Sequence, residues 1–313
     1  MRITALAGGI GAGKFLRGLV REVEESDVTA IVNTGDDISM HGLHVSPDLD
    51  SVTYWLGDAF DRERGWGRRD ETFRATEELR RFDPDLAWFN LGDQDLATHL
   101  FRTNLLASGT GLSEVTARVA ARFGIRARLL PMTEDPVTTR IVVAAGGREL
   151  DLHFQEYWVR RGARDDVKST RYEGAGAARP GPGVLDAIAE ADAVVICPSN
   201  PVASIGPILA VPGVREAVER RRDRVVGVSG IVRGAPLAGM ADRLMPGAGV
   251  EVTAAGAADF YRGLLGAWVI DEGDRSLAAR IGSNGIRVVV TDTIMVDDAA
   301  ARALARVALD AIA

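Results

Sequence analysis

The sequence of 313 residues holds a single cysteine, Cys197. One thiol excludes an intramolecular disulfide and a cysteine-ligated zinc site. Apolar runs are also short, because none reaches the roughly 18 residues that a membrane-spanning helix requires. The first residues, MRITALAGG, carry no signal-peptide pattern, since glycines interrupt the apolar run at once. These absences predict a cytoplasmic protein that does not associate with a membrane.

An excess of positive charge is missing as well. The chain carries 37 Lys and Arg against 44 Asp and Glu, which gives a formal net charge of -7. Proteins that bind nucleic acid usually present a basic face, so a nucleic-acid partner is not expected. Hydrophobic residues make up 46% of the chain, which is enough to bury one large core or two smaller ones.

Short apolar runs alternate with helical periodicity at both ends of the chain. Residues 2–7 form an apolar run, a helical pattern extends to residue 25, and a second apolar run covers 28–32. The last third shows the same alternation, with strand-like runs in DAVVICPSNP and near 224–228, 267–270 and 287–290, and a helix near 298–312. We therefore predict an α/β protein with a Rossmann-like, doubly wound and mostly parallel sheet.

The middle of the chain follows a different pattern. Residues 60–126 carry helical spacing interrupted by Pro84 and closed by Gly124, which predicts a mainly helical insertion. The α/β core is then assigned to residues 1–59 and 127–313, with a β-hairpin near 137–160 around the sequence GGRE. From residue 160 to 183 the chain is charged and then rich in glycine, alanine and proline, and we predict a loop or mobile segment there.

The first apolar run ends in the glycine-rich stretch AGGIGAGKF. Two known signatures each fail by one residue: a P-loop needs Ser or Thr where Phe15 stands, and the Rossmann fingerprint needs glycine where Lys14 stands. The stretch nevertheless joins a strand to a helix, where backbone N–H groups and the helix dipole favour an anion. Gly8, Gly9 and Gly11 are therefore candidates for phosphate binding. The alternative is a tight turn that needs glycine only for its backbone angles.

Four aspartates follow the second apolar run: Asp36, Asp37, Asp48 and Asp50. Ligands of open α/β sheets lie at the carboxyl ends of the strands, and several acids gathered there need a cation to neutralise them. Mg²⁺ accepts one or two carboxylates together with substrate phosphates. This group is thus the candidate for the metal site that Phe15 denies to the glycine-rich stretch. The alternatives are helix capping by PDLD and ribose contact by GDD.

Two further segments combine polar side chains with a defined geometry. In LGDQDLATHLFRTN, Asp95 and His99 stand four residues apart and Arg102 follows one turn later, which predicts either an ion pair on a helix surface or a contact with a substrate phosphate. In CPSNP, two prolines stiffen the loop that holds Ser199 and Asn200. Both side chains are candidates for binding a base or a phosphate; the alternative is a turn that only ends the strand.

In this order and spacing, these segments resemble the 2-phospho-L-lactate transferase family of coenzyme F420 biosynthesis. The motifs that carry the resemblance span nearly the whole chain: AGGIGAGKF (7–15), VNTGDD (32–37), SPDLDS (46–51), RGWG (64–67), LGDQDLATHLFRTN (91–104), LLPMTEDPV (129–137), HFQEYWV (153–159), SNPVASIGPIL (199–209) and GMADRLM (239–245). RGWG and HFQEYWV are more similar to the actinobacterial branch, for which the phosphoenolpyruvyl conjugate is the expected donor.

The resemblance implies a transferase that moves a phosphoenolpyruvyl or 2-phospho-L-lactyl group from its guanosine diphosphate conjugate to the ribityl hydroxyl of the deazaflavin Fo. The reaction releases GMP and uses a divalent cation, usually Mg²⁺. A homodimer is also expected, because relatives commonly form dimers. The alternative is a nucleotide-sugar-binding regulatory protein of the same superfamily, which shares the glycine-rich stretch and the SNP loop.

The resemblance also assigns residues. The deazaflavin contacts fall on Asp50 and Asn90, the latter at a position where archaeal relatives often carry a basic residue. The donor-binding loops correspond to five residues of this chain: Gly8, Gly9, Gly11, Ser199 and Asn200. We expect Asp36 and Asp50 to bind the metal, and Asp50 to orient the attacking hydroxyl or to accept its proton.

Overall fold

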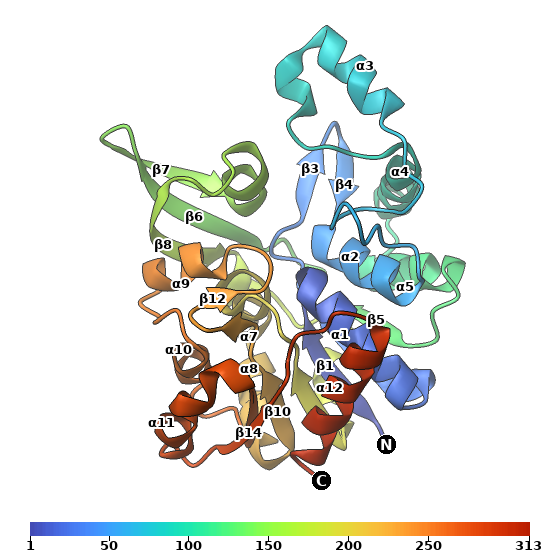
Figure 1. The fold of residues 1–313 in the computed structure, drawn as a ribbon. Helices are drawn as coiled ribbons and strands as arrows, with labels where there is room; N and C mark the ends of the chain where they lie inside the picture. The colour runs from blue at the N-terminus through green and yellow to red at the C-terminus, as the bar shows by residue number, and fades with distance from the viewer.

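The computed structural model describes residues 1–313 and is built on a seven-stranded parallel sheet (Figure 1). The order across the sheet is β14-β13-β10-β9-β1-β2-β5. Its strands are β1 (Ile3–Ala7), β2 (Val28–Val32), β5 (Arg128–Pro131), β9 (Ala193–Ile196), β10 (Val225–Val228), β13 (Ala267–Asp271) and β14 (Arg287–Thr291). The predicted α/β class is confirmed, and so is each strand predicted in the last third of the chain.

Apolar residues on both faces of the sheet place it at the centre of the protein. Successive residues of a strand point to opposite faces, so Leu6 of β1 joins one buried cluster while Ala5 and Ala7 join the other. The cluster around Ala5 and Ala7 is covered by α1 (Gly9–Glu22), α2 (Pro47–Leu56), α5 (Leu112–Arg122) and α12 (Asp298–Asp310). The opposite cluster is covered by α6 (Val184–Glu190), α7 (Gly206–Ala210), α8 (Val214–Glu219), α9 (Ala241–Gly247), α10 (Ala254–Phe260) and α11 (Ala278–Gly282).

Between residues 60 and 126 the chain contributes no strand to this sheet. It forms α3 (Arg74–Phe82), the short helix η2 (Pro84–Ala87), α4 (Asp93–Ala107) and α5, and α3 projects from the body at the top of Figure 1. The carboxylate of Asp93 accepts from the backbone N–H of Ala75 (3.0 Å) at the start of α3. Glu71 in turn accepts from the backbone N–H of Gln94 (2.7 Å) at the start of α4. These caps fix α4 in place.

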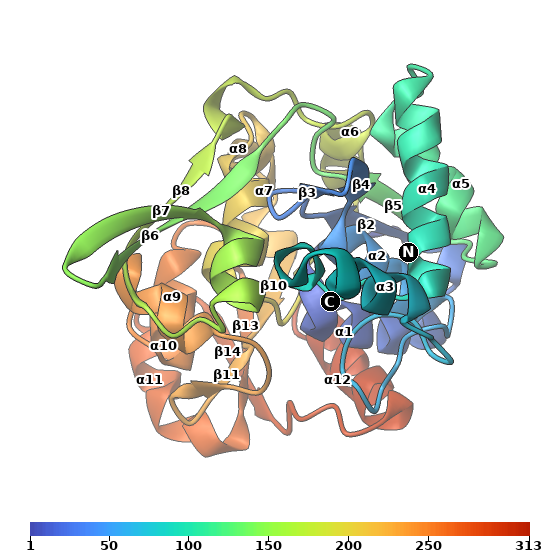
Figure 2. The same ribbon diagram turned by 90° about the horizontal axis from the view of Figure 1, so that it is seen from above.

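Two small antiparallel sheets flank the carboxyl edge of the large sheet. The first is the hairpin of β3 (Ile38–Met40) and β4 (Leu43–Val45), which lies beside α4. The second has the order β7-β6-β8 and consists of β6 (Thr138–Ala145), β7 (Arg148–His153) and β8 (Asp166–Glu173). Seen from above, the second sheet and α4 lie on opposite sides of the protein (Figure 2).

The predicted hairpin near 137–160 is confirmed, with its turn at Gly146 and Gly147, which both have positive φ. The predicted loop or mobile segment at 160–183 is wrong for residues 166–173, because β8 pairs with β6 there. This edge strand is mostly polar, and only Val167 and Tyr172 pack against the core. An edge strand with so few apolar residues gives no strand-like pattern in the sequence.

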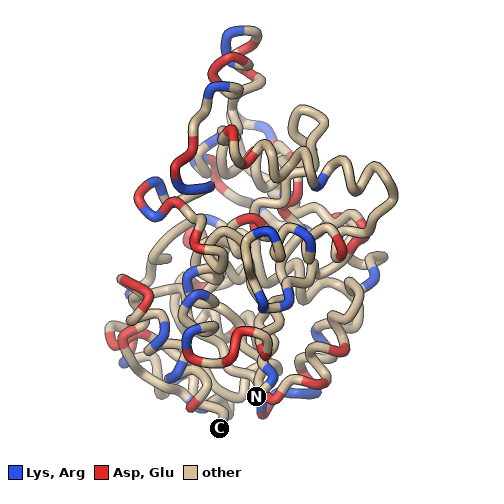
Figure 3. Tube along the Cα trace, turned by 90° about the vertical axis from the view of Figure 1, so that its right-hand side faces the viewer, with Lys and Arg blue, Asp and Glu red and all other residues tan.

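Acidic and basic residues are interspersed along the chain (Figure 3). None of the helices combines the length with the apolar character that crossing a membrane requires.

The direction in which successive strands are added to the sheet reverses between β1 and β9, which are neighbours. β2 and β5 lie on one side of β1, whereas β9, β10, β13 and β14 lie on the other. The segments that leave β1 and β9 meet at the carboxyl edge, where a side chain at Gly11 would clash with the carbonyl of Pro198. Open α/β sheets bind their ligands at such a switch point.

Candidate functional site

The glycine-rich turn lies at the start of α1, against residues from distant parts of the chain. Gly9 has a left-handed backbone (φ +72°), which glycine adopts without strain. At Gly8, a Cβ atom would lie 2.5 Å from Oδ2 of Asp48 and 2.6 Å from Cβ of Ser204. Glycine is therefore required here for the turn and also for the close approach of its neighbours. Phe15 is fully buried in the core, so its ring serves packing.

The loop after β9 holds the two predicted residues Ser199 and Asn200. Oδ1 of Asn200 accepts from the backbone N–H groups of Val202 (3.0 Å) and Ala203 (3.1 Å), so this oxygen caps the helical turn η5 (Pro201–Ile205). Ser199 is 8% exposed, and its hydroxyl has no hydrogen-bond partner. Because a buried hydroxyl without a partner costs free energy, Ser199 is the side chain of this loop that is available to a ligand.

Asp36 and Asp48 form a buried pair of carboxylates beside the glycine turn. Asn33 donates to Oδ2 of Asp48 (2.9 Å) and to Oδ1 of Asp36 (3.4 Å). Gln155 donates to Oδ2 of Asp36 (2.9 Å). Burial raises the pKa of Asp36 well above its usual range, and the charge of Asp48 raises it further. Burial likewise raises the pKa of Asp48 to about 7.

Asp37 is held by a separate set of bonds. Its Oδ2 lies 2.8 Å from Nε2 of His44 and accepts from the hydroxyl of Ser46 (2.8 Å). Nε2 of His153 donates to the backbone carbonyl of Asp37 (3.0 Å). Burial raises the pKa of Asp37, and the hydrogen bond from His44 opposes this shift. Residues from β4 and β7 thus fasten the segment after β2 from two sides.

Asp50 pairs with Arg102. Asp50 is 5% exposed and Arg102 is 2% exposed. The two terminal nitrogens of the guanidinium each donate to one carboxylate oxygen, with Nη1 3.1 Å from Oδ2. Burial lowers the pKa of Arg102, but the charge and hydrogen bonds of Asp50 raise it more, so the arginine stays protonated. The ion pair predicted on a helix surface is wrong, because His99 and Arg102 are buried in a network with Asp50 and Asp95. The alternative, a contact with a substrate phosphate, stays a prediction.

The predicted metal residues Asp36 and Asp50 have different neighbours: Asp50 pairs with Arg102, whereas Asp36 lies beside the acids Asp48 and Asp37. No group of three or more His, Cys, Asp or Glu side chains is arranged to hold a metal ion. Mg²⁺ needs only one or two carboxylates when phosphates supply other ligands. Asp36 and Asp48 fit this requirement, because both are buried next to the glycine turn and neither has a cationic partner.

Asn90 lies outside these clusters. Its side chain is exposed, and its Oδ1 accepts from Nη2 of Arg80 (3.3 Å). The next residue, Leu91, is buried with Val45 of β4. Asn90 therefore makes no hydrogen bond to Asp50, and its deazaflavin role stays a prediction.

Three residues of the site were not singled out from the sequence: Asn33, Gln155 and Ser204. Each stands inside a motif of the resemblance, VNTGDD, HFQEYWV and SNPVASIGPIL respectively. A polar residue directly after the apolar run 28–32 was the available signal for Asn33. Gln155 and Ser204 had no comparable signal, because their contacts with Asp36 and Asp48 depend on tertiary packing.

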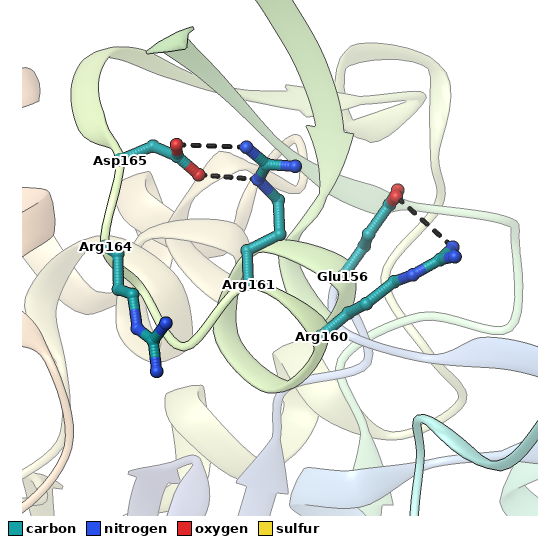
Figure 4. A pocket seen from close by; sticks show the side chains of 5 residues that line it. All are labelled: Glu156, Arg160, Arg161, Arg164 and Asp165. Atoms are coloured by element: carbon teal, nitrogen blue, oxygen red, sulfur yellow. Dashed lines mark hydrogen bonds and ion pairs between the residues drawn. The ribbon is translucent and has the colours of Figure 1, made fainter. Parts of the chain in front are cut away.

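The segment that directly follows Gln155 in the chain lines a cavity of about 580 Å³ (Figure 4). It is lined by charged residues only: Glu156, Arg160, Arg161, Arg164 and Asp165. Arg161 is paired with Asp165 through two hydrogen bonds (2.5 and 3.0 Å). Arg160 lies 3.5 Å from Asp85 of η2, so this cavity borders a contact between the β6–β8 sheet and the helical segment.

Comparisons with known proteins agree with the resemblance. A family model described as 2-phospho-L-lactate transferase CofD matches residues 3–309. The chain is 48% identical over 311 residues to a protein of Streptomyces griseus named phosphoenolpyruvate transferase, covering 99% of this chain and 98% of that protein. It is 42% identical over 326 residues to a protein of the same name from Mycolicibacterium smegmatis, with 99% and 98% covered. A crystal structure of a UPF0052 family member from Bacillus halodurans aligns with 98% of each chain at a TM-score of 0.62 and 16% identity, which shows a shared fold.

Proposed function

Since the chain belongs to the 2-phospho-L-lactate transferase CofD family, we propose that it transfers a phosphoenolpyruvyl group from its guanosine diphosphate conjugate to the ribityl hydroxyl of Fo. The family itself makes the chain a phospho-carboxylate transferase of coenzyme F420 biosynthesis. The phosphoenolpyruvyl unit is favoured over 2-phospho-L-lactyl because relatives at 42% and 48% identity are named phosphoenolpyruvate transferase.

The proposed reaction is a phosphoryl transfer. The hydroxyl oxygen of Fo attacks the phosphorus that carries the enolpyruvyl group and forms a new P–O bond. The bond from this phosphorus to the bridging oxygen breaks, the electron pair stays on that oxygen, and GMP leaves. The hydroxyl proton passes to a base. Such a reaction depends mainly on alignment and on neutralising charge, with little covalent work by the protein.

The observation that carries the proposal is the buried carboxylate pair beside the glycine turn at the start of α1. Backbone N–H groups at the first turn of α1 favour an anion, and the Ser199 hydroxyl lacks a partner. These groups would bind the donor diphosphate. Asp36 and Asp48 would hold Mg²⁺, which neutralises charge on the diphosphate when bound. Asp50 would orient the Fo hydroxyl through a hydrogen bond.

The test is an incubation with Fo, Mg²⁺ and the guanosine diphosphate conjugate of each acid, followed by mass spectrometry. We expect GMP release only when all three components are present, and a product whose mass equals Fo plus the phosphoenolpyruvyl group. A product formed only from the 2-phospho-L-lactyl conjugate would change the donor assignment. Tight binding of a UDP-sugar without any response to Fo would overturn the proposed reaction in favour of the regulatory alternative.

A further inference from the structure

The start of α2 directs two aspartates toward different surroundings. Asp48 and Asp50 both lie in its first turn, and residues two apart on an α-helix are separated by about 200° around the axis. Asp48 therefore faces Gly8 and Asn33, next to the glycine turn. Asp50 faces α4 and meets Arg102 there.

Arg102 is itself fixed by its neighbours. Its Nη1 donates to Nδ1 of His99 (3.2 Å) and to the backbone carbonyl of His44 (3.4 Å). Nε2 of His99 lies 3.5 Å from Oδ2 of Asp95, and Asp95 accepts a hydrogen bond from Tyr54 of α2. The guanidinium therefore has little freedom to turn away from the carboxylate.

The pairing gives Asp50 a defined direction. A guanidinium that bonds both oxygens holds the carboxylate in one plane. Each carboxylate oxygen can still accept a further hydrogen bond, because it has two lone-pair sites. A metal ion at Asp50 would instead have to compete with a buried cation of like charge.

We propose that Arg102 is a positioning residue, which holds Asp50 as an oriented hydrogen-bond acceptor for the Fo hydroxyl and keeps it out of the metal site. This inference rests on the proposed function, since it takes Fo as the acceptor. In this proposal Asp36 and Asp48 bind Mg²⁺ without Asp50. Binding of Fo at Asp50 is then independent of the metal.

The test measures the dissociation constant of Fo by equilibrium titration in the presence of EDTA, for the wild type, Arg102→Gln, Arg102→Lys and Asp50→Asn. We expect an increase of about tenfold for Arg102→Gln and Asp50→Asn, equivalent to the loss of one charge-assisted hydrogen bond. Arg102→Lys keeps the charge but not the bidentate geometry, so we expect partial rescue, with an increase of about threefold.

Steady-state kinetics give the second readout. In Arg102→Lys, KM for Fo should rise, while the Mg²⁺ concentration for half-maximal rate should stay within about twofold of the wild type, because only acceptor binding is disturbed. Asp36→Asn should do the reverse, with a higher Mg²⁺ requirement and unchanged binding of Fo in EDTA.

Arg17→Gln is the matched control for a lost ion pair. Arg17 pairs with Asp58 and Asp298 and has no hydrogen bond to Asp50 or Arg102, so its loss should leave the Fo dissociation constant unchanged. Unchanged metal-free Fo binding in folded Arg102→Lys and Asp50→Asn would overturn the inference, as would a Mg²⁺ requirement that rises as in Asp36→Asn. A wild type that binds no Fo at all would instead refute the proposed function.

Discussion

The buried aspartates of the site differ in what surrounds their charge. Asp36 and Asp48 receive hydrogen bonds from neutral groups only, which include the side chains of Asn33 and Gln155 and the backbone N–H of Gly9. Asp50 meets the fixed positive charge of Arg102. Asp36 and Asp48 have no cationic partner within the protein, whereas Asp50 is paired with one. The same residue type at the start of one helix thus meets two different environments.

The largest effect on turnover is expected at Asp48, whose carboxylate has no cationic partner in the protein. Asp48→Asn should lower kcat by about a thousandfold, because a preorganised charge at the transferred group is lost. It should also raise the Mg²⁺ concentration for half-maximal rate. Both are measured by GMP release at varied Mg²⁺. Asp186→Asn on the exposed surface of α6 is the matched control, and an unaltered Mg²⁺ requirement in Asp48→Asn would contradict the metal assignment.

A smaller loss of activity is expected at Asp50, whose carboxylate is paired with Arg102. Asp50→Asn should reduce kcat/KM for Fo by about a hundredfold, since a positioned acceptor for the attacking hydroxyl is removed. The Mg²⁺ requirement should hardly change, which separates this variant from Asp48→Asn. Turnover of Fo equal to that of the wild type would remove Asp50 from the reaction.

Stability should respond in opposite directions at the two sites. The pKa of Asp48 is raised to about 7, above its ordinary value of about 4 in an unfolded chain. The folded state therefore binds more protons between these values, and stability should fall as pH rises from about 4 to about 7. Asp48→Asn removes this penalty and should stabilise the metal-free protein at pH 8 by a few kcal/mol.

Asp50→Asn should destabilise the protein by about 3–5 kcal/mol, because it leaves Arg102 buried without a partner. Urea denaturation in EDTA, repeated from pH 5 to pH 8, measures both variants. Destabilisation of the same size by the two substitutions would contradict the distinction between Asp48, which has no cationic partner, and Asp50, which is paired with Arg102.

The fold could be predicted because strands that are buried on both faces consist mostly of apolar residues. β1, β9 and β13 are buried along their whole length and consist mostly of apolar residues, as both of their faces are covered. β8 was missed because its exposed face is polar and its pairing with β6 is set by the fold. Local pattern thus identifies elements that are buried on both faces and fails for those at an edge.

The site was predictable only where position along the chain determines position in space. Gly8 and Ser199 follow neighbouring strands of one sheet, so their proximity follows from the topology. The pair of Asp50 and Arg102 joins residues 52 apart in the sequence. Helical spacing placed Asp95, His99 and Arg102 on one face of α4, but it carried no information about what that face contacts.

The smallest expected effect is a change of KM for Fo, which tests whether the acceptor site extends from Asp50 to Asn90. Asn90 is exposed, and its one side-chain hydrogen bond is from Arg80. If Asn90 contacts Fo, as the resemblance implies, Asn90→Ala should raise KM for Fo about fivefold with kcat unchanged, since one hydrogen bond of about 1 kcal/mol is lost. Asn104→Ala, also exposed but on α4, provides the matched control. A KM equal to that of the wild type would confine the acceptor site to the Asp50 side of α4, where the carboxylate and its arginine are already in place.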